Sequence, residues 1–350
     1  MEAKLPQHWK SIQRCIFPEF EDEVGPTTPM HQRIMVAIDV LGFERHILET
    51  SLFAKGRPQL SRAAFANSFI AKAILNLHST KQLIERLKID RVLLMLCGFD
   101  PSKKLPCEAS FSNAFSEMAE SEILNEIHAA VVKDGLKDDV VFHISRDATD
   151  VPAREKVAKV AKKDKGKRKT KKLRGMDRRL AKQGSMTLEE MLKDLPSEVG
   201  SATKRGHSWK GYKLHLDVSD QGIPISAVLT SAQVHDSQVA LPLEEMSSKR
   251  VASLYTLMDS AYDAEEIKEF IVKKDKISII EPHVRATQTR ELDPASRARY
   301  KERTTVERAF SWLKDAYGMR RIQVKGIRKV MVHIMAGILA LTAIRLVSTA

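Results

Sequence analysis

The chain has 350 residues, of which 43% are hydrophobic and 29% are charged, a composition typical of a soluble globular protein with two or three domains. The net charge is +13, but residues 154–182 alone hold fifteen Lys or Arg against three Asp or Glu, so the rest of the chain is close to neutral. A basic excess confined to one short segment favours a polyanionic partner. The three cysteines are far apart and include no Cys-x2-Cys pair, which argues against a disulfide framework or zinc ribbon and fits a reducing compartment.

The first third of the chain is expected to be mainly helical. Residues 1–30 hold four prolines and an acidic run, which predicts an irregular arm. Residues 31–135 show helical periodicity: Ser61 can cap one helix, a second spans residues 80–96, and a third starts at Ser110. The sequence therefore predicts an N-terminal all-α domain. It is either a helix-turn-helix-like DNA-binding module or a plain helical bundle that packs or dimerises.

A strand with a charged far end follows the helical part. Residues 140–149 alternate and are rich in β-branched side chains, which predicts a strand that carries Asp147 on the same side as His143 and Ser145. The basic segment at residues 154–183 has few apolar and no aromatic side chains, so it cannot supply a core. We expect it to be a flexible insertion on the surface.

The remaining elements alternate between strands and helices. Strands are predicted at residues 209–219, 223–229, 254–258 and 277–280, and helices are expected to start at Asp236 or Ser237 and at Asp263. In the strand 209–219, apolar residues alternate with Lys213, His215 and Asp217, which predicts a half-buried strand. A strand, a two-stranded hairpin and then alternating helices and strands are the element order of a ribonuclease-H-like domain. The predicted fold class is thus α/β, a mixed sheet flanked by helices over residues 136–350, behind the all-α domain.

A polar pattern at helical spacing lies near the C-terminus. Tyr300, Arg303, Glu307 and Lys314 are three, four and seven residues apart, which places them on one face of a helix. Such a face could offer Glu307 to a metal ion while the two cations meet phosphate oxygens. For a single helix, a salt-bridged surface face explains the same pattern.

Three carboxylates stand where chemistry is expected. Asp147 and Asp259 each follow or end a predicted strand, where ligands bind in mixed sheets, and Glu307 lies on the following helix. Oxygen-only ligands suit Mg²⁺ or Mn²⁺, and two such ions can drive an in-line displacement at phosphorus. The sequence has no metal-spaced Cys/His cluster, no Gly-x-Ser-x-Gly elbow and no Gly-x4-Gly-Lys-Ser/Thr loop, so no nucleotide cofactor is expected.

Each aspartate also has a structural explanation and a neighbour that could replace it. An aspartate at a strand end often caps a turn. Asp150 could stand in for Asp147, and Asp263 for Asp259. We favour Asp147 because Asp150 is expected beyond the strand, and Asp259 because Asp263 is expected to cap a helix.

The spacing Tyr-x2-Arg-x3-Glu-x6-Lys resembles the signature of bacterial insertion-sequence transposases, the DDE enzymes with a ribonuclease-H-like core. The segments Ser145-Arg-Asp-Ala-Thr149 and Leu257-Met-Asp-Ser-Ala-Tyr-Asp263 stand where that family has them, and Cys107–Met118 resembles its N-terminal helical domain. The resemblance implies that Asp147, Asp259 and Glu307 are catalytic and hold two Mg²⁺ or Mn²⁺ ions. It also implies cleavage at the element ends and strand transfer into target DNA.

The resemblance extends to partners. Double-stranded DNA, both element ends and target, would be the substrate of a homodimer in the bacterial cytoplasm, associated with the nucleoid. Arg303 and Lys314 would contact phosphates, and Tyr300 would bond or stack nearby. The basic segment is expected to add phosphate contacts through Lys162, Lys163, Lys167, Arg168, Lys169, Lys171 and Lys172.

Two other classes of protein remain open at this point. One is a catalytically inactive or co-opted DNA-binding protein derived from a transposase. The other is a membrane-surface protein that uses the basic segment and the apolar stretch from Val330 to Val347. That stretch contains His333 and is barely long enough to span a bilayer, so we expect a buried helix and no membrane partner.

Overall fold

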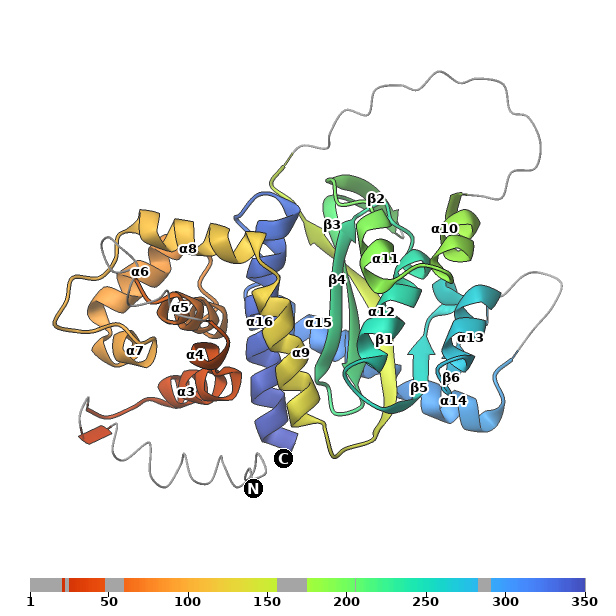
Figure 1. Ribbon diagram of the computed structural model, residues 1–350, viewed down its shortest axis with the longest axis horizontal. Coiled ribbons are helices and arrows are strands. Elements are labelled where there is room, and N and C mark those ends of the chain that lie inside the picture. Colours follow the sequence, from red (N-terminus) through yellow and green to blue (C-terminus); the bar gives the residue numbers. More distant parts are fainter. Residues whose placement is uncertain are drawn as a thin grey trace, which may run out of the picture. The chain divides into compact units, whose positions relative to one another are not determined.

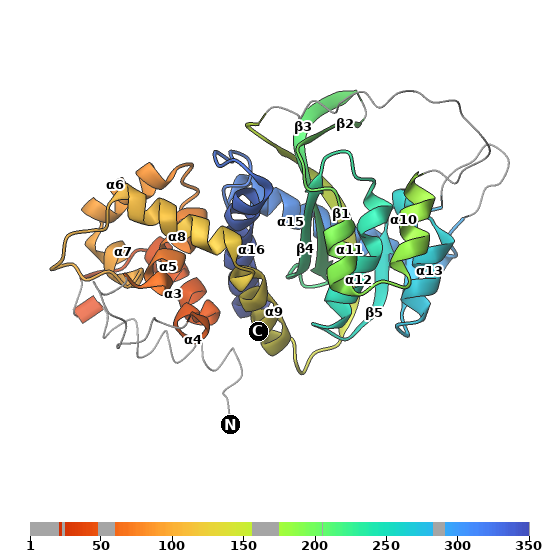
Figure 2. The same ribbon diagram turned by 45° about the horizontal axis from the view of Figure 1, so that its top comes forward.

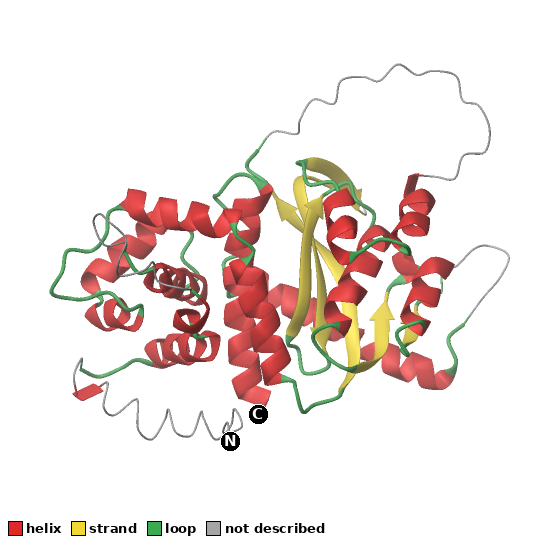
Figure 3. Cartoon of the chain, in the orientation of Figure 1, coloured by secondary structure: helices red, strands yellow, loops and turns green. Residues whose placement is uncertain are grey.

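The computed structural model describes residues 21–22, 25–47, 60–155, 175–204, 206–282 and 291–349. Packing divides the chain into two units, one formed by residues up to 135 with residues 311–350, and the other by residues 136–310. The first is helical and the second contains the sheet, as the colours of Figure 3 show.

The helical unit is built from short helices around one long apolar helix. Helix α16 (Ile327–Thr349) contacts α3, α5, α8 and α9. The bounds of the shorter helices are α3 Pro29–Leu41, α4 Phe43–His46, α5 Arg62–Ile74, α6 Thr80–Ile89, α7 Arg91–Leu96, α8 Glu108–Glu120 and α9 Ile123–Gly135. By length and composition α16 could cross a membrane, but 78% of its apolar window is buried inside the protein. The prediction of a buried helix is therefore confirmed, although the sequence assigned residues 311–350 to the catalytic domain.

Helix caps in this unit follow the sequence in part. The Ser61 side chain accepts a hydrogen bond from the Ala64 amide at the start of α5, as predicted. The helix expected at residues 80–96 is broken, because Asp90 ends α6 and caps α7 through the Leu93 amide. Cys107, and not Ser110, is the N-cap residue of α8.

The sheet unit has six strands in the order β2-β3-β1-β5-β6, with β4 also paired to β3 (Figure 1). The strands are β1 Val141–Pro152, β2 Gly200–Lys204, β3 His207–Ser219, β4 Pro224–Ser231, β5 Ser253–Met258 and β6 Ile277–Ile280. Strands β1, β3 and β4 are antiparallel, whereas β1, β5 and β6 run parallel. This confirms the predicted α/β class, a mixed sheet flanked by helices and preceded by a helical region. Strand β2 was not predicted.

Helices cover one face of the sheet with a shared apolar core (Figure 2). They are α10 Gly175–Gln183, α11 Leu188–Asp194, α12 Ala240–Ser248 and α13 Glu265–Val272, joined by the 3-10 helices η2 Asp236–Val239 and η3 Ser260–Tyr262. Met258, Tyr262 and Ile267 are among the buried residues of this core. The opposite face carries α14 Pro294–Tyr300, η4 Lys301–Arg303 and the start of α15 Thr304–Asp315, because Ser145 of β1 bonds to the Thr305 hydroxyl at 2.8 Å.

The prediction of a half-buried strand at residues 209–219 is wrong. Lys213 is largely buried, and His215 and Asp217 are fully buried, alongside the apolar residues of β3. Both faces of this strand are buried, and its charged side chains have buried partners, since Asp217 pairs with Arg146 and Lys213 pairs with Asp236. Alternation of polarity therefore reflected buried ion pairs and not solvent.

Candidate active site

The register of the parallel strands brings the two candidate aspartates together. The pairing of β1 with β5 ends at Ser145 opposite Leu257, and Asp147 and Asp259 each follow two residues later, close enough for the charge of Asp147 to act on Asp259. Neighbouring strands are about 5 Å apart, and Asp147 points to the same face of the sheet as Ser145. Strand β5 ends at Met258, whereas β1 continues to Pro152. Asp147 and Asp259 therefore lie where β5 ends and β1 continues beside it.

The Asp147 side chain is largely buried and accepts two hydrogen bonds. Its side chain is 14% exposed, its Oδ1 accepts a hydrogen bond from the Ala148 amide at 2.8 Å, and its Oδ2 accepts one from Nη1 of Arg303 at 3.1 Å. These contacts fix the direction in which the carboxylate leaves the strand.

Glu307 reaches the same guanidinium from the first turn of α15. Its Oε1 accepts a hydrogen bond from Nη2 of Arg303 at 2.9 Å, and its side chain is 55% exposed. Arg303 thus bridges a carboxylate of β1 and a carboxylate of α15, which shows that the two acids converge on one positive group. Its side chain is only 16% exposed, so this contact is partly shielded from water.

Asp259 begins the 3-10 helix η3. Its Oδ1 accepts a hydrogen bond from the Ala261 amide at 3.0 Å. Burial raises the pKa of Asp259, and the nearby carboxylates of Asp147 and Asp236 raise it further. Desolvation and like charges both disfavour the ionised form, so this site would be relieved by a cation.

Asp147, Asp259 and Glu307 have the ligand chemistry of a divalent metal site. In the described part of the chain, however, no three His, Cys, Asp or Glu side chains are close enough together to coordinate an ion. The donors of Asp147, Asp259 and Glu307 are all oxygens, the set that Mg²⁺ and Mn²⁺ prefer. The Arg303 guanidinium lies where a cation is attracted, between Asp147 and Glu307. We take it as the stand-in for positive charge at this centre.

The alternative aspartates lie elsewhere, for reasons other than those expected. Asp150 belongs to β1, opposite Lys213, and three residues from Asp147 it points to the other face. Asp263 does not cap α13, whose N-cap residue is Ala264; its carboxylate pairs with Lys268 at 2.7 Å. The expected cap at Asp263 was therefore wrong, and it is Asp259 that caps a helix.

The predicted helical face from Tyr300 to Lys314 is interrupted. Helix α14 ends at Tyr300 and α15 begins at Thr304, with the 3-10 turn η4 between them, so Tyr300 and Arg303 precede the helix that carries Glu307. The Tyr300 hydroxyl donates to Oε2 of Glu281 at 3.2 Å, and the Arg303 guanidinium lies 5.8 Å from the centre of its ring. Lys314 lies two turns after Glu307 on α15.

Sequence reasoning missed Asp236. It lies at the start of η2, which contacts η3, and it pairs with Nζ of Lys213 at 2.8 Å. Burial raises the pKa of the Tyr262 hydroxyl, and the charges of Asp236 and Asp147 add to this. The signal was the segment His235-Asp236-Ser237, which was interpreted as a helix start. A 3-10 helix does begin at Asp236, but the expected cap at Asp236 or Ser237 is wrong, because His235 is the N-cap residue of η2.

The prediction of a flexible insertion over residues 154–183 is wrong for its last part, because residues 175–183 form α10, where Leu180 is buried in the core under the sheet and Arg179 pairs with Asp194. The seven basic residues named as DNA contacts lie outside the described part of the chain, so the structure places none of these seven. They are Lys162, Lys163, Lys167, Arg168, Lys169, Lys171 and Lys172.

Fold and site together define a class of protein: an α/β domain with a mixed sheet of ribonuclease-H-like type and three acids near one strand end. Residues 143–343, more than half of the chain, match the family model described as the transposase DDE domain, and residues 19–117 match the transposase domain DUF772. The chain therefore belongs to the family of insertion-sequence DDE transposases, which act on DNA and generally use divalent metal ions. A search of curated proteins found no match.

Proposed function

We propose that this protein cleaves DNA at the ends of an insertion sequence and transfers the freed strand into target DNA. The observation that carries the proposal is the convergence of acids from β1, β5 and α15: Asp147 and Asp259 through the strand register, and Asp147 and Glu307 through Arg303. Membership of the DDE transposase family supports the same reaction class.

In this proposal Asp147, Asp259 and Glu307 hold two Mg²⁺ or Mn²⁺ ions. The chemistry supplied by such a bound pair is activation of the attacking oxygen and stabilisation of the leaving oxygen at phosphorus. Asp147 and Asp259 are held in fixed directions by the Ala148 and Ala261 amides. Arg303 bridges Asp147 and Glu307 in this structure, and with both acids engaged as metal ligands its guanidinium would be available to bind a phosphate oxygen of the DNA.

The remaining contacts in the proposal follow from charge. Lys314 and the basic segment bind the phosphate backbone, and Tyr300 bonds or stacks near the cut. Two element ends must be joined, so we infer that a homodimer is the active form. The proposed location is the bacterial cytoplasm, with the nucleoid DNA as target.

The test is the substitution Glu307→Gln, which keeps the size and the hydrogen bond of the side chain but removes the charge. We expect strand cleavage to fall by on the order of 100-fold or more, while the affinity for DNA stays nearly unchanged. Cleavage of labelled end-sequence DNA with Mn²⁺ on gels, alongside a binding titration, measures both.

Glu302→Gln is the matched control, because Glu302 is exposed on the neighbouring turn η4 and makes no part of the proposed metal site. This variant should cleave like the parent. Full activity of the Glu307→Gln protein would reject the assignment of Glu307. A parent protein that binds DNA but cleaves none with either metal would instead favour a co-opted DNA-binding protein.

A further inference from the structure

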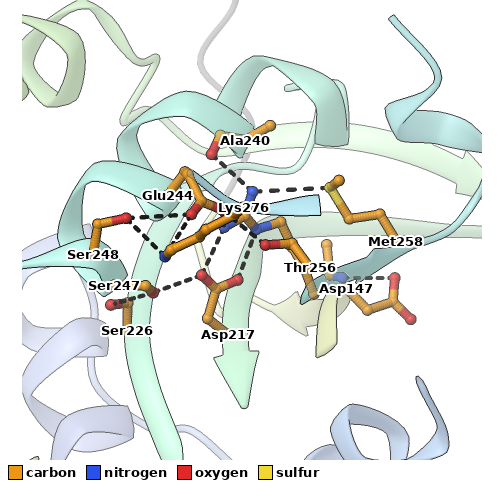
Figure 4. Close-up of polar contacts among 12 residues, drawn as sticks. Asp147, Asp217, Ser226, Ala240, Glu244, Ser247, Ser248, Thr256, Met258 and Lys276 are labelled. Carbon is orange, nitrogen blue, oxygen red and sulfur yellow. Dashed lines mark hydrogen bonds and ion pairs between the residues drawn. The ribbon is translucent and has the colours of Figure 1, made fainter. Parts of the chain in front are cut away.

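A buried cluster of four charged side chains lies behind β1, on the face opposite Asp147. The side chains of Arg146, Asp217 and Glu244 are 0% exposed and that of Lys276 is 5% exposed. Two positive and two negative groups make the cluster neutral. Figure 4 shows it between the sheet and α12, with Asp147 turned away from it.

Arg146 is the centre of the cluster. Its Nε and Nη2 donate to the two carboxylate oxygens of Asp217, both at 2.7 Å, in a two-pronged pair. Nη2 also donates to Oε2 of Glu244 at 2.9 Å, and Nη1 donates to the carbonyl oxygen of Ala240 at 3.0 Å. Every nitrogen of the guanidinium is therefore bound to strand β3 or helix α12.

Lys276 forms a second pair with Glu244. Its Nζ donates to Oε1 of Glu244 at 2.9 Å and to the Ser248 hydroxyl at 2.8 Å. The Ser247 hydroxyl donates to Oδ2 of Asp217 at 2.6 Å. The cluster thus consists of an inner pair, Arg146 with Asp217, and an outer pair, Glu244 with Lys276.

Stability alone does not explain such a cluster. Desolvation of buried ions offsets most of their attraction, and apolar replacements of similar volume are often neutral or stabilising. Buried charges can instead specify one arrangement of the chain over others, because the alternatives leave a charge unpaired.

The inner pair is a cross-strand pair, because Arg146 of β1 stands directly opposite Asp217 of β3. Arg146 and Asp147 are consecutive, so they point to opposite faces of the sheet. A slip of one residue would turn Asp147 into the buried cluster and Arg146 into the active site. Two negative groups would then face each other in the interior, at a high electrostatic cost.

We propose that the buried pair Arg146–Asp217 locks the register of β1 against β3 and so aims Asp147 at the metal site. Arg146 is a positioning residue: it touches neither substrate nor metal and acts through its neighbour. The inference deepens the proposed function and rests on Asp147 being a metal ligand.

The test replaces one neutral pair at a time. The inner-pair variant is Arg146→Met with Asp217→Leu, which leaves Glu244 bound to Lys276. The matched control is Glu244→Gln with Lys276→Met, which leaves Arg146 bound to Asp217. Each variant loses one buried pair of zero net charge, but only the first loses the cross-strand contact.

The readouts are the melting temperature, Mn²⁺ binding followed by the electron paramagnetic resonance of free Mn²⁺, and hydrogen exchange of the β1 amides. We expect the inner-pair variant to stay folded but to bind Mn²⁺ about 10-fold more weakly or worse, the size of effect seen when support of a metal ligand is lost. Its β1 amides should exchange faster. The control should match the parent in both. Parent-like Mn²⁺ affinity and exchange in the inner-pair variant would overturn the inference.

Asp147→Asn separates this inference from the proposed function. If the parent and Asp147→Asn bind Mn²⁺ equally, the metal assignment fails, and unchanged exchange in the inner-pair variant then overturns the register lock as well. If the inner-pair variant does not fold, Arg146→Lys keeps the charge but loses the two-pronged geometry. The Arg146→Lys protein should bind Mn²⁺ more weakly than the parent, and parent-like affinity would count against the proposal.

Discussion

At the scale of single residues, the candidate site is held in an unfavourable electrostatic state. The charge of Asp147 acts on Asp259, and among the described residues the only positive group shown to bind either acid directly is Arg303 on Asp147. Burial and the neighbouring carboxylates raise the pKa of Asp259. In the folded protein the ionised form of Asp259 is therefore disfavoured relative to the protonated form. Such a perturbed carboxylate is typical of functional sites.

Asp259→Asn should stabilise the protein at neutral pH in the absence of divalent ions. A raised pKa in the folded state means that ionised Asp259 costs stability above that pKa, and the cost disappears as the pH falls through it. Asparagine keeps the acceptor for the Ala261 amide, so the cap survives. Thermal melts in EDTA at pH 7 and at pH 4 measure the effect: the gain at pH 7 should shrink at pH 4.

Asp263→Asn is the control for this substitution. Asp263 pairs with Lys268, so loss of its charge should leave stability unchanged or slightly lower. A lower melting temperature for Asp259→Asn than for the parent at pH 7 would contradict the argument.

At the scale of elements, α5 illustrates how packing exceeds what periodicity predicts. The sequence indicates one apolar face that includes Phe65 and Phe69, and both are buried. Helices α3, α8 and α16 also pack on α5, so Asn67, Ser68 and Lys72 are buried as well. Nζ of Lys72 lies 3.3 Å from Nδ1 of His333 on α16. Among the described residues, no carboxylate is shown to bind the Lys72 ammonium group in this helical core.

Lys72→Met should stabilise the protein at pH 7. Burial lowers the pKa of Lys72 to about 8. Since the folded pKa lies below the ordinary value, stability falls as the pH drops from about 10.5 to 8, and the full cost remains below pH 8. Removing the buried charge should raise the free energy of unfolding by about 3 kcal/mol, and losing the hydrogen bond to His333 should lower it by about 1 kcal/mol. The expected net increase is about 2 kcal/mol.

Urea denaturation at pH 7 and pH 10.5 measures this gain, which should vanish or reverse at the higher pH. Lys133→Met on α9 is the control, because Lys133 is exposed and should change stability by less than about 0.5 kcal/mol. Destabilisation of the Lys72→Met protein at pH 7 would show that the buried charge is compensated.

At the scale of the whole molecule, positive charge is concentrated in one segment of the chain. Fifteen Lys or Arg lie in residues 154–182, directly after the strand that carries Asp147. The segment starts directly after β1, and its last part forms α10, whose Gln183 donates to the carbonyl oxygen of Gln238 at 2.9 Å on η2. Chain connectivity therefore ties both of its ends to elements next to the candidate site, where DNA phosphates would lie.

Replacing residues 156–174 with a neutral Gly/Ser linker of equal length should flatten the dependence of log K for DNA on log salt concentration. Each phosphate contact that is lost should reduce the slope by about 0.9. Fluorescence anisotropy with duplex DNA over a range of salt concentrations measures it. The same linker with Lys and Arg restored in scrambled order is the control and should keep the steep slope. An unchanged slope with the neutral linker would rule out phosphate contacts by this segment.

The sequence by itself determined the strands of the sheet other than β2, the α/β class, and the three acids worth testing. Strand alternation and the acids at strand ends are local patterns, so they can be read without coordinates. The family match agrees with this reading, while the assignment of metal to Asp147, Asp259 and Glu307 stays a prediction.

Tertiary structure alone decided which acids face one another. The nearness of Asp147 to Asp259 depends on the register of β1 with β5, and the burial of Asp217 depends on Arg146 reaching it from another strand. The break before Thr304 and the cap at Asp259 were equally invisible in the periodicity. Contacts between residues far apart in the chain fix all of these features, and local sequence patterns do not encode such contacts.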